Sequence, residues 1–183
     1  RKTDPPSVPN NIPCQAADLP VSEDPAYQIV SNTGAGNSTV AEPNCGFYDG
    51  SDIWYALTVP PSGAFTVYTQ WRAVGDAAMA IYSGTCGSLT EIACDDDTNG
   101  LMPEISLGNQ TPGEIVFVRL YTYGNYEQGT FGLRAEENCI GAMPNDLACA
   151  AIDLDMGNVI IGANDCATDA QGPARPNCWT NGE

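Results

Sequence analysis

The side chains able to do chemistry in this sequence are mostly carboxylates. Its 183 residues include 23 Asp and Glu, 6 Lys and Arg, and no histidine. Without histidine the chain lacks the commonest general base, the Ser-His and Cys-His nucleophile pairs and most zinc sites. Two carboxylates can hydrolyse a glycosidic bond, but the acidic residues are scattered over turns and form no recognisable pair. The sequence therefore predicts a protein that is not an enzyme.

The densest acidic cluster is the segment Asp95-Asp96-Asp97-Thr98-Asn99-Gly100. Carboxylates on a Gly-ended turn are the hard oxygen ligands that calcium prefers, although the spacing and closing Glu of an EF-hand loop are absent. Two interpretations stay open, a solvated acidic turn and a bound Ca²⁺. The ligands of a calcium site would be Asp95, Asp96, Asp97 and Asn99. Asp76 and Glu104 would join them only if the fold brings them close.

Aromatic residues near predicted turns and strand ends form a second candidate site, because an exposed ring can stack on the apolar face of a sugar. The candidate ligand-binding residues are Trp71, Tyr121, Tyr123 and Tyr126. Trp54 is expected to differ from these four, since it begins a strand and should be buried in the core. For Trp71, a binding platform and a packed loop residue are both open.

Charge limits the class of partner. The formal net charge of -17 would repel a phosphate backbone or an anionic leaflet. The sequence has no apolar run of the length that spans a bilayer. We therefore expect neither nucleic-acid binding nor membrane insertion. The expected partners are copies of the chain itself or an extracellular polysaccharide or matrix protein.

The eight cysteines indicate disulfides, since there is no Cys-x-x-Cys pair and no histidine to complete a zinc site. Disulfides persist outside the reducing cytosol, so the chain is expected in an extracellular or cell-surface location.

Short strand-like runs bounded by turn residues predict an all-β protein, an antiparallel jelly-roll-like β-sandwich stapled by disulfides. The expected strands span residues 53–59, 64–70, 77–82, 89–93, 115–123 and 130–135, and one short helical turn is expected within residues 10–19. Residues 1–13 are rich in proline and read as a linker before a domain at residues 14–138.

An internal repeat places an incomplete second copy at residues 139–183. The segment around Cys14 recurs around Cys149, and Pro-Asn-Cys at 43–45 recurs at 176–178. The second copy lacks the later strands, so it is either a truncated repeat or a segment that completes another chain. Its apolar residues Val159, Ile160 and Ile161 could add a strand to the sheet edge of a neighbour and so build a fibre head to tail.

The repeat also suggests a disulfide pairing. Cys14 with Cys45, and Cys149 with Cys178, would be equivalent bridges, each closing a loop of about 30 residues and contributing roughly 3 to 4 kcal/mol. Cys86 and Cys94 suit a hairpin staple. Cys139 and Cys166 remain as the fourth pair.

Several motifs together resemble the bacterial pre-peptidase C-terminal domain family, in the cysteine-containing form found as tandem repeats in secreted or surface proteins. They are Asp52-Ile53-Trp54-Tyr55, Asp76 to Gly84, Cys94-Asp95-Asp96-Asp97, Leu107 to Leu120 and Gly129 to Leu133. The resemblance implies a jelly-roll-like sandwich without catalytic activity, appended to secreted hydrolases or strung along adhesins.

Two functions follow as expectations. The first is a non-enzymatic structural or adhesive repeat, such as a subunit of a surface fibre assembled by strand addition. The alternative is a carbohydrate- or matrix-binding module carried by a larger secreted hydrolase.

Overall fold

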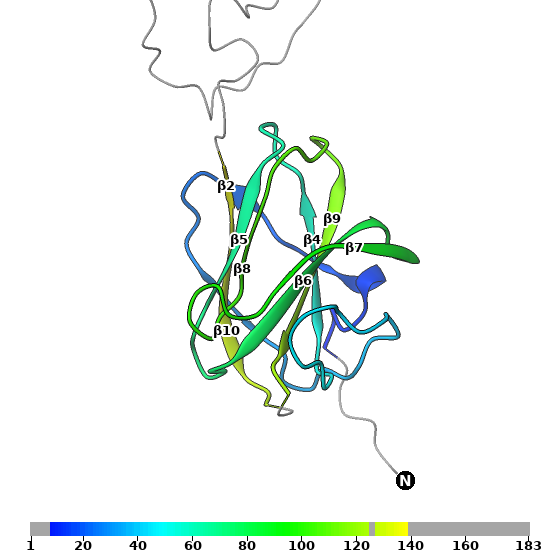
Figure 1. The fold of residues 1–183 in the computed structure, drawn as a ribbon, viewed down its shortest axis with the longest axis vertical. Coiled ribbons are helices and arrows are strands. Elements are labelled where there is room, and N and C mark those ends of the chain that lie inside the picture. The colour runs from blue at the N-terminus through cyan, green and yellow to red at the C-terminus, as the bar shows by residue number, and fades with distance from the viewer. Residues whose placement is uncertain (1–7, 125–126, 139–183) are drawn as a thin grey trace, which may run out of the picture.

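The computed structural model describes residues 8–124 and 127–138, which form two β-sheets packed face to face (Figure 1). The first sheet has the strand order β1 (Ala17–Asp18), β4 (Ile53–Thr58), β9 (Ile115–Thr122), β6 (Ala77–Thr85) and β7 (Ser88–Asp95). The second has the order β2 (Val21–Ser22), β10 (Thr130–Glu137), β5 (Phe65–Gln70) and β8 (Glu104–Leu107), and β3 (Gln28–Ser31) also pairs with β10.

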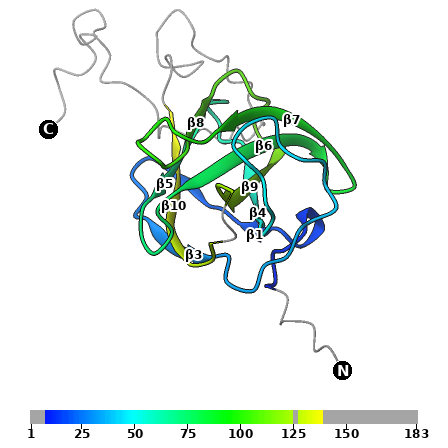
Figure 2. The same ribbon diagram turned by 60° about the horizontal axis from the view of Figure 1, so that its bottom comes forward.

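The chain crosses repeatedly between the two sheets. It runs from β4 in the first sheet to β5 in the second, returns for β6 and β7, crosses to β8, returns for β9 and ends in β10. Figure 2 shows β5 and β10 on one side and β4, β6 and β9 on the other, and the crossing of the chain between the two sheets is what the term jelly-roll-like describes. The neighbours pair antiparallel except for β1 with β4 and β2 with β10, which are parallel.

The main core lies between the sheets and follows the period-two alternation of the strands. In β4, the inward-facing residues are Ile53, Tyr55 and Leu57, and they pack with Phe65 and Val67 of β5. Burying each of these large apolar side chains is worth about 1.5 to 3 kcal/mol. Such packing between two twisted sheets fixes the register of every strand that contributes to it.

The first sheet is buried on its outer face as well. Trp54, Ala80, Tyr82 and Phe117 form a second apolar cluster there, against which Ala16 and Val40 pack. The cover is supplied by the N-terminal segment, with its 3-10 turn η1 (Pro13–Gln15), and by the long connection between β3 and β4. Trp54 is fully buried, which confirms its assignment to the core.

The all-β sandwich predicted from sequence is confirmed, and each of the six expected strands is present. The strands β1, β2, β3 and β8 were not expected; they have two to four residues each. The antiparallel prediction is corrected at the two parallel pairs, both made by these short N-terminal strands. Asn10, within the segment expected to be a linker, is buried and bonds through its Nδ2 to the carbonyl of Trp54 at 3.1 Å.

The expected second repeat at 139–183, with Val159, Ile160 and Ile161, lies outside the described residues. Within the described part of the chain, no helix is long and apolar enough to cross a membrane.

Candidate binding surface at one end of the sandwich

Four connections meet at one end of the sandwich, which we call the loop end. They are residues 45–52 before β4, 71–76 between β5 and β6, 96–103 between β7 and β8, and the described residues of 123–129 between β9 and β10. Backbone hydrogen bonds join them: Tyr123 N donates to Asp76 O, and Ala77 N donates to Leu101 O. Loops held in this way by a rigid scaffold are where binding residues concentrate.

Two aromatic rings stand side by side at the loop end. The Phe47 side chain is 58% exposed and that of Tyr123 is 41% exposed, with 6.4 Å between ring centroids and 54° between their planes. Phe47 is held in place because the Gly124 N–H donates to the Phe47 carbonyl at 2.8 Å. A side chain at Gly124, which has a positive φ, would collide with the Phe47 ring. The backbone beneath the ring pair is therefore held in place.

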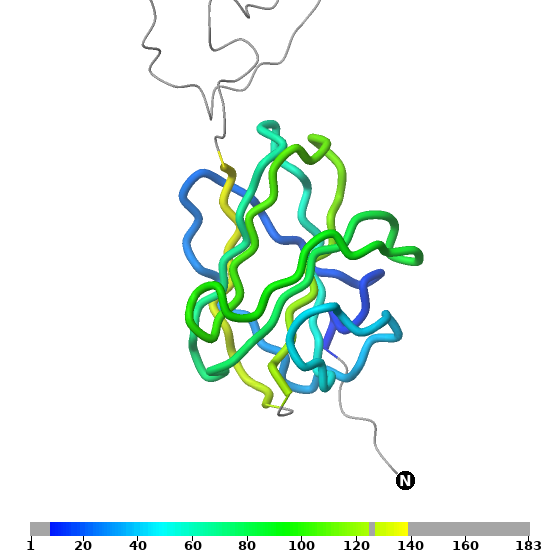
Figure 3. The backbone as a smooth tube through the Cα atoms, viewed as in Figure 1, coloured from blue at the N-terminus to red at the C-terminus, as the bar shows by residue number. Residues whose placement is uncertain are grey.

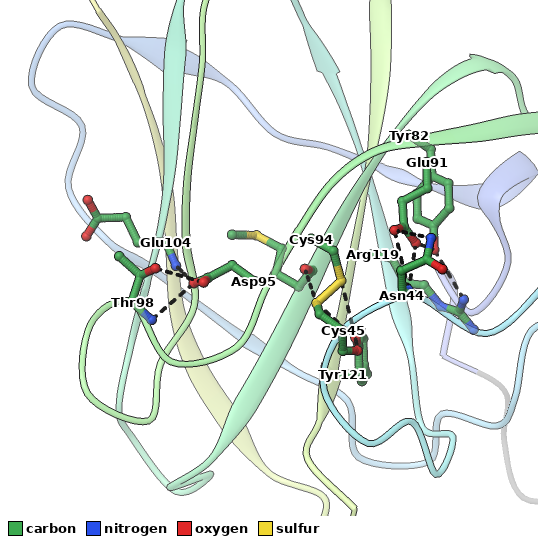
Figure 4. Close-up of a disulfide and its surroundings, with 11 residues drawn as sticks. Asn44, Cys45, Tyr82, Glu91, Cys94, Asp95, Thr98, Glu104, Arg119 and Tyr121 are labelled. Carbon is green, nitrogen blue, oxygen red and sulfur yellow. Dashed lines mark hydrogen bonds between the residues drawn. A yellow bond between two sulfur atoms is a disulfide. The ribbon is translucent and has the colours of Figure 1, made fainter.

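The backbone beneath Phe47 is fixed by a disulfide and a tyrosine. Cys45 is bonded to Cys94 of β7, and the Tyr121 hydroxyl donates to the Cys45 carbonyl at 2.7 Å (Figure 4). Gly46, between Cys45 and Phe47, also has a positive φ, and a Cβ there would meet the Ala78 side chain at 2.9 Å. The chain can turn out to present Phe47 only because this residue is glycine.

Trp71 is the third exposed ring at the loop end. Its side chain is 64% exposed at the start of the connection between β5 and β6. The sequence left open whether Trp71 is a platform or a packed loop residue, and its exposure favours the platform.

The acidic turn lies at the same end and is organised by Asp95. Its carboxylate accepts hydrogen bonds from the Thr98 hydroxyl at 2.7 Å, the Thr98 N–H at 3.2 Å and the Glu104 N–H at 2.9 Å (Figure 4). These bonds close the turn and join the end of β7 to the start of β8. Asp95 thus has a structural role within the turn.

Asp76 and Asp96 lie close enough to feel each other's charge. Burial raises the pKa of Asp76 above its usual value, and the charges of Asp97, Asp96 and Glu127 raise it further. Burial likewise raises the pKa of Asp96, with Asp97 and Asp95 adding to the shift. The fold therefore brings Asp76 beside the predicted calcium ligands.

Calcium binding itself stays a prediction. Asn99 of the predicted ligand set forms an isolated β-bridge with Met102. Glu104 contributes its backbone N–H to Asp95, as described above. Among the described residues, no three His, Cys, Asp or Glu side chains are gathered closely enough to hold a metal ion as they stand.

The predicted ligand-binding set is corrected at Tyr121. Its side chain stands on the outer face of β9 and is fully buried, so it cannot stack on a ligand. Its burial raises the pKa of the Tyr121 hydroxyl. Tyr126 lies outside the described residues. Sequence reasoning missed Phe47. Nothing in the residues around it shows whether its ring is exposed, as the structure has it, or buried in the core.

Two of the predicted disulfides, Cys14–Cys45 and Cys86–Cys94, are wrong. The bonds join Cys14 to Cys86 and Cys45 to Cys94, with sequence separations of 72 and 49 residues. The hairpin of β6 and β7 is thus not stapled to itself. Its turn is bonded to the N-terminal segment, and its second strand to the connection before β4. The remaining cysteines, Cys139, Cys149, Cys166 and Cys178, lie outside the described residues.

A buried ion pair anchors the connection that carries Phe47. Arg119 Nε donates to Asp52 Oδ2 at 2.8 Å, and Arg119 Nη1 donates to the Ala41 carbonyl at 2.7 Å. Burial is the largest single influence on the pKa of Arg119 and lowers it, but the Asp52 carboxylate together with Tyr82 and Tyr48 outweighs burial, so the pKa of Arg119 is raised. Asp52 also accepts hydrogen bonds from the Ser38 hydroxyl and from Trp54 Nε1 at 2.6 and 2.9 Å.

Comparisons with known proteins give a limited similarity. No family model matches the chain, and no curated protein matches it. Among solved structures, the chain is similar to the crystal structure of the pre-peptidase C-terminal domain of collagenase from Bacillus anthracis. That match has 11% sequence identity and a TM-score of 0.38, and covers 64% of this chain and 95% of that one. The similarity concerns the same family that the sequence motifs resemble, but at this level it does not establish membership of that family.

Proposed function

We propose that this chain is a non-catalytic extracellular module that binds a neutral polysaccharide through the loop end. The observation that carries the proposal is the presence of three exposed aromatic side chains, Phe47, Trp71 and Tyr123, at one end of the sandwich. Monomeric proteins rarely expose large rings together without a partner. Rings held on a fixed backbone bind sugars at a low cost in conformational entropy.

The carboxylates at the loop end favour binding of a neutral sugar over binding of an anionic ligand. The exposed Asp97, beside Asp96 and Asp76, can accept hydrogen bonds from sugar hydroxyls. The net charge of -17 opposes an anionic polysaccharide. A neutral polysaccharide satisfies both features, because it offers apolar ring faces for stacking and hydroxyl groups for the carboxylates.

The extracellular setting is supported by the two disulfides, which are stable in an oxidising compartment. The non-catalytic role is supported by the absence of histidine from the sequence. Asp76 and Asp96 owe their raised pKa to burial and to neighbouring carboxylates, which is the behaviour expected of a crowded acidic surface.

The test is binding of the full chain to immobilised neutral glycans and to insoluble polysaccharides. Phe47→Ala, Trp71→Ala and Tyr123→Ala should each weaken binding by about tenfold, since a stacked ring contributes about 1 to 2 kcal/mol. Ile115→Ala is the matched control, because Ile115 is exposed at the start of β9, which is the opposite end of the sandwich. If all three ring variants bind glycan as well as the wild type does, the loop end is not the binding site. Capture of a matrix protein with no glycan bound would reject the polysaccharide, and hydrolysis of a bound glycan would reject the non-catalytic role.

A further inference from the structure

A separate hollow of about 550 Å³ lies on the outer face of the first sheet, away from the loop end. Three segments form it: the N-terminal turn at 12–14, the connection at 39–44, and the β6–β7 hairpin at 82–91. Figure 3 traces these segments in blue, light blue and green. The volume is within the range of pockets that hold small ligands, about 300 to 1,000 Å³.

Two disulfides and a hydrogen bond hold the three walls in position. The Cys14–Cys86 disulfide joins the N-terminal turn to the hairpin and itself lines the hollow. The Cys45–Cys94 disulfide fastens the end of the 39–44 connection. Arg119 Nη1 holds the Ala41 carbonyl from behind. A pocket with fixed walls loses little conformational entropy when a ligand enters.

The lining combines an apolar surface with two carboxylates. Val40, Leu89 and Ile12 supply aliphatic contacts, and Glu42 and Glu91 supply negative charge. Among the residues that the structure describes, no lysine or arginine lines the hollow. The charge of Arg119 behind it is compensated by Asp52, so the field in the hollow is that of the glutamates.

Glu91 is positioned by the polar groups around it. Its carboxylate accepts hydrogen bonds from Asn44 Nδ2 at 2.8 Å, from the Asn44 N–H at 3.2 Å and from the Tyr82 hydroxyl at 3.4 Å (Figure 4). An ionised carboxylate has about four acceptor positions, so these three donors leave room for one more. Because these hydrogen bonds already order the Glu91 side chain, an ammonium group that binds there would not pay the entropy cost of ordering it.

We propose that this hollow binds a primary alkylammonium group, with the ammonium on Glu91 and Glu42 and its aliphatic stem along Val40 and Leu89. The end of a lysine side chain has this chemistry, and so does a free alkylamine. A carboxylate favours a cation, and the apolar walls favour a hydrocarbon stem over a bare metal ion. This site is independent of the polysaccharide surface proposed above.

The experiment is an NMR titration of the ¹⁵N-labelled full chain with two probes, Nα-acetyl-lysine methylamide and n-butylamine. Saturable shifts of the Val40, Leu89 and Glu91 amide signals are expected with either probe. Shifts with the blocked lysine identify a lysine side chain as a ligand, and shifts with butylamine alone identify a free amine. Acetylating the lysine Nζ removes the charge and should abolish binding. Equal binding of the acetylated probe, or no saturable shift with either amine, would overturn the proposal.

Variants separate charge from folding. Glu91→Gln should weaken binding about tenfold, as expected for a lost charge-assisted hydrogen bond. Gly87→Lys is the second variant, because a Cβ at this hollow-lining residue meets nothing within 4 Å and leaves the fold undisturbed. It places a competing ammonium at the hollow and should weaken binding, whereas Gly87→Gln should not. Glu114→Gln, in the distant connection before β9, is the control. Wild-type affinity in both Glu91→Gln and Gly87→Lys would overturn the proposal, while Phe47→Ala should leave amine binding unchanged.

Discussion

Arg119 Nε and Asp52 Oδ2 lie 2.8 Å apart with both side chains fully buried, so one ion pair stands in the outer face of the first sheet. The guanidinium also lies 4.2 Å from the centre of the Tyr48 ring. This pair connects β9 to the start of β4, and through Ala41 and Ser38 it holds the long connection that covers the sheet.

Removing one partner of this pair should destabilise the protein strongly. Asp52→Ala leaves Arg119 charged and buried without its partner, and we expect a loss of about 3 to 5 kcal/mol in the free energy of unfolding. The surface pair of Arg134 and Glu136, with 19% and 28% exposed side chains, is the control. Glu136→Ala should cost less than about 1 kcal/mol. Urea unfolding of both variants provides the measurement, and a cost for Asp52→Ala as small as that of Glu136→Ala would contradict the expectation.

The disulfide connectivity can be checked by peptide mapping under non-reducing conditions. Fragments joined through Cys14 and Cys86, and through Cys45 and Cys94, are expected. Replacing both members of either pair by serine should lower the free energy of unfolding by about 4 kcal/mol, given the long loops that are closed. A fragment joining Cys86 to Cys94 would restore the hairpin staple expected from the sequence.

Alkaline pH should unfold the protein through its buried tyrosines. Burial raises the pKa of Tyr48 and of Tyr55 from 10.0 to about 12. Because the neutral phenol is favoured in the folded state, this stabilisation is complete below pH 10 and is lost as the pH rises through 12. Tyr55→Phe should flatten the loss of stability over this window. The measurement is the melting temperature of both proteins from pH 8 to 12. If it falls equally steeply with pH in the variant and the wild type, Tyr55 does not contribute to the alkaline loss of stability.

The carboxylates of Asp76 and Asp96 should also make the folded state more stable as the pH falls. Since the pKa values of Asp76 and Asp96 are raised in the folded state, protonation favours folding as the pH falls through the raised values towards 3.8. Asp76→Asn should therefore stabilise the protein at pH 7, by less than about 1 kcal/mol because solvent screens the repulsion. The gain should vanish near pH 3.8. A variant that is less stable than wild type at pH 7 would show that Asp76 makes a favourable contact.

The same carboxylates provide the test of the predicted calcium site. If Asp95, Asp96, Asp97 and Asn99 bind Ca²⁺, added calcium should raise the melting temperature, and a chelator should reverse the rise. Asp97→Asn should reduce the rise, because Asp97 is exposed in the turn. A melting temperature that does not change with calcium would contradict the calcium site and favour the other interpretation, a solvated acidic turn.

Fibre formation by strand addition is tested by removing residues 139–183. If Val159, Ile160 and Ile161 add a strand to a neighbour, the full chain should form filaments and the truncated chain should be a folded monomer. Light scattering and negative-stain microscopy of both forms make the comparison. Monomers in both cases would reject assembly by this segment and leave the binding module as the role of the described domain.

The parts of the fold that the sequence predicted are apolar or β-branched runs of five or more residues bounded by turn residues, such as β4 and β5. The short strands β1, β2 and β3 carry too few residues for a period to appear, and they form because β4 and β10 offer edges to pair with. Local sequence cannot reveal such pairing partners.

The candidate site was predicted only in part, for a related reason. The exposure of Trp71 and Tyr123 was predicted correctly because turns expose their residues, whereas their role in ligand binding stays a prediction. Tyr121 was misplaced because its position near the end of a predicted strand was taken to expose its ring, which is fully buried. The outer face of β9 is instead covered by the connection that Arg119 holds, and that cover comes from residues about 75 positions earlier in the chain. The disulfide error has the same origin, since both bonds join segments distant in sequence.

The two disulfides also determine how the domain would respond to mechanical force. A force applied to the two ends of the domain is transmitted from Cys14 to Cys86 through their disulfide. The residues between these two cysteines form a covalently closed loop and are not extended by the force. Only the chain from the end of β6 onward can be drawn out. Strands β1 to β6, with the Phe47 connection, lie within this closed loop and would not be stretched while β7 to β10 were pulled away, and reduction of the disulfide would release the enclosed length.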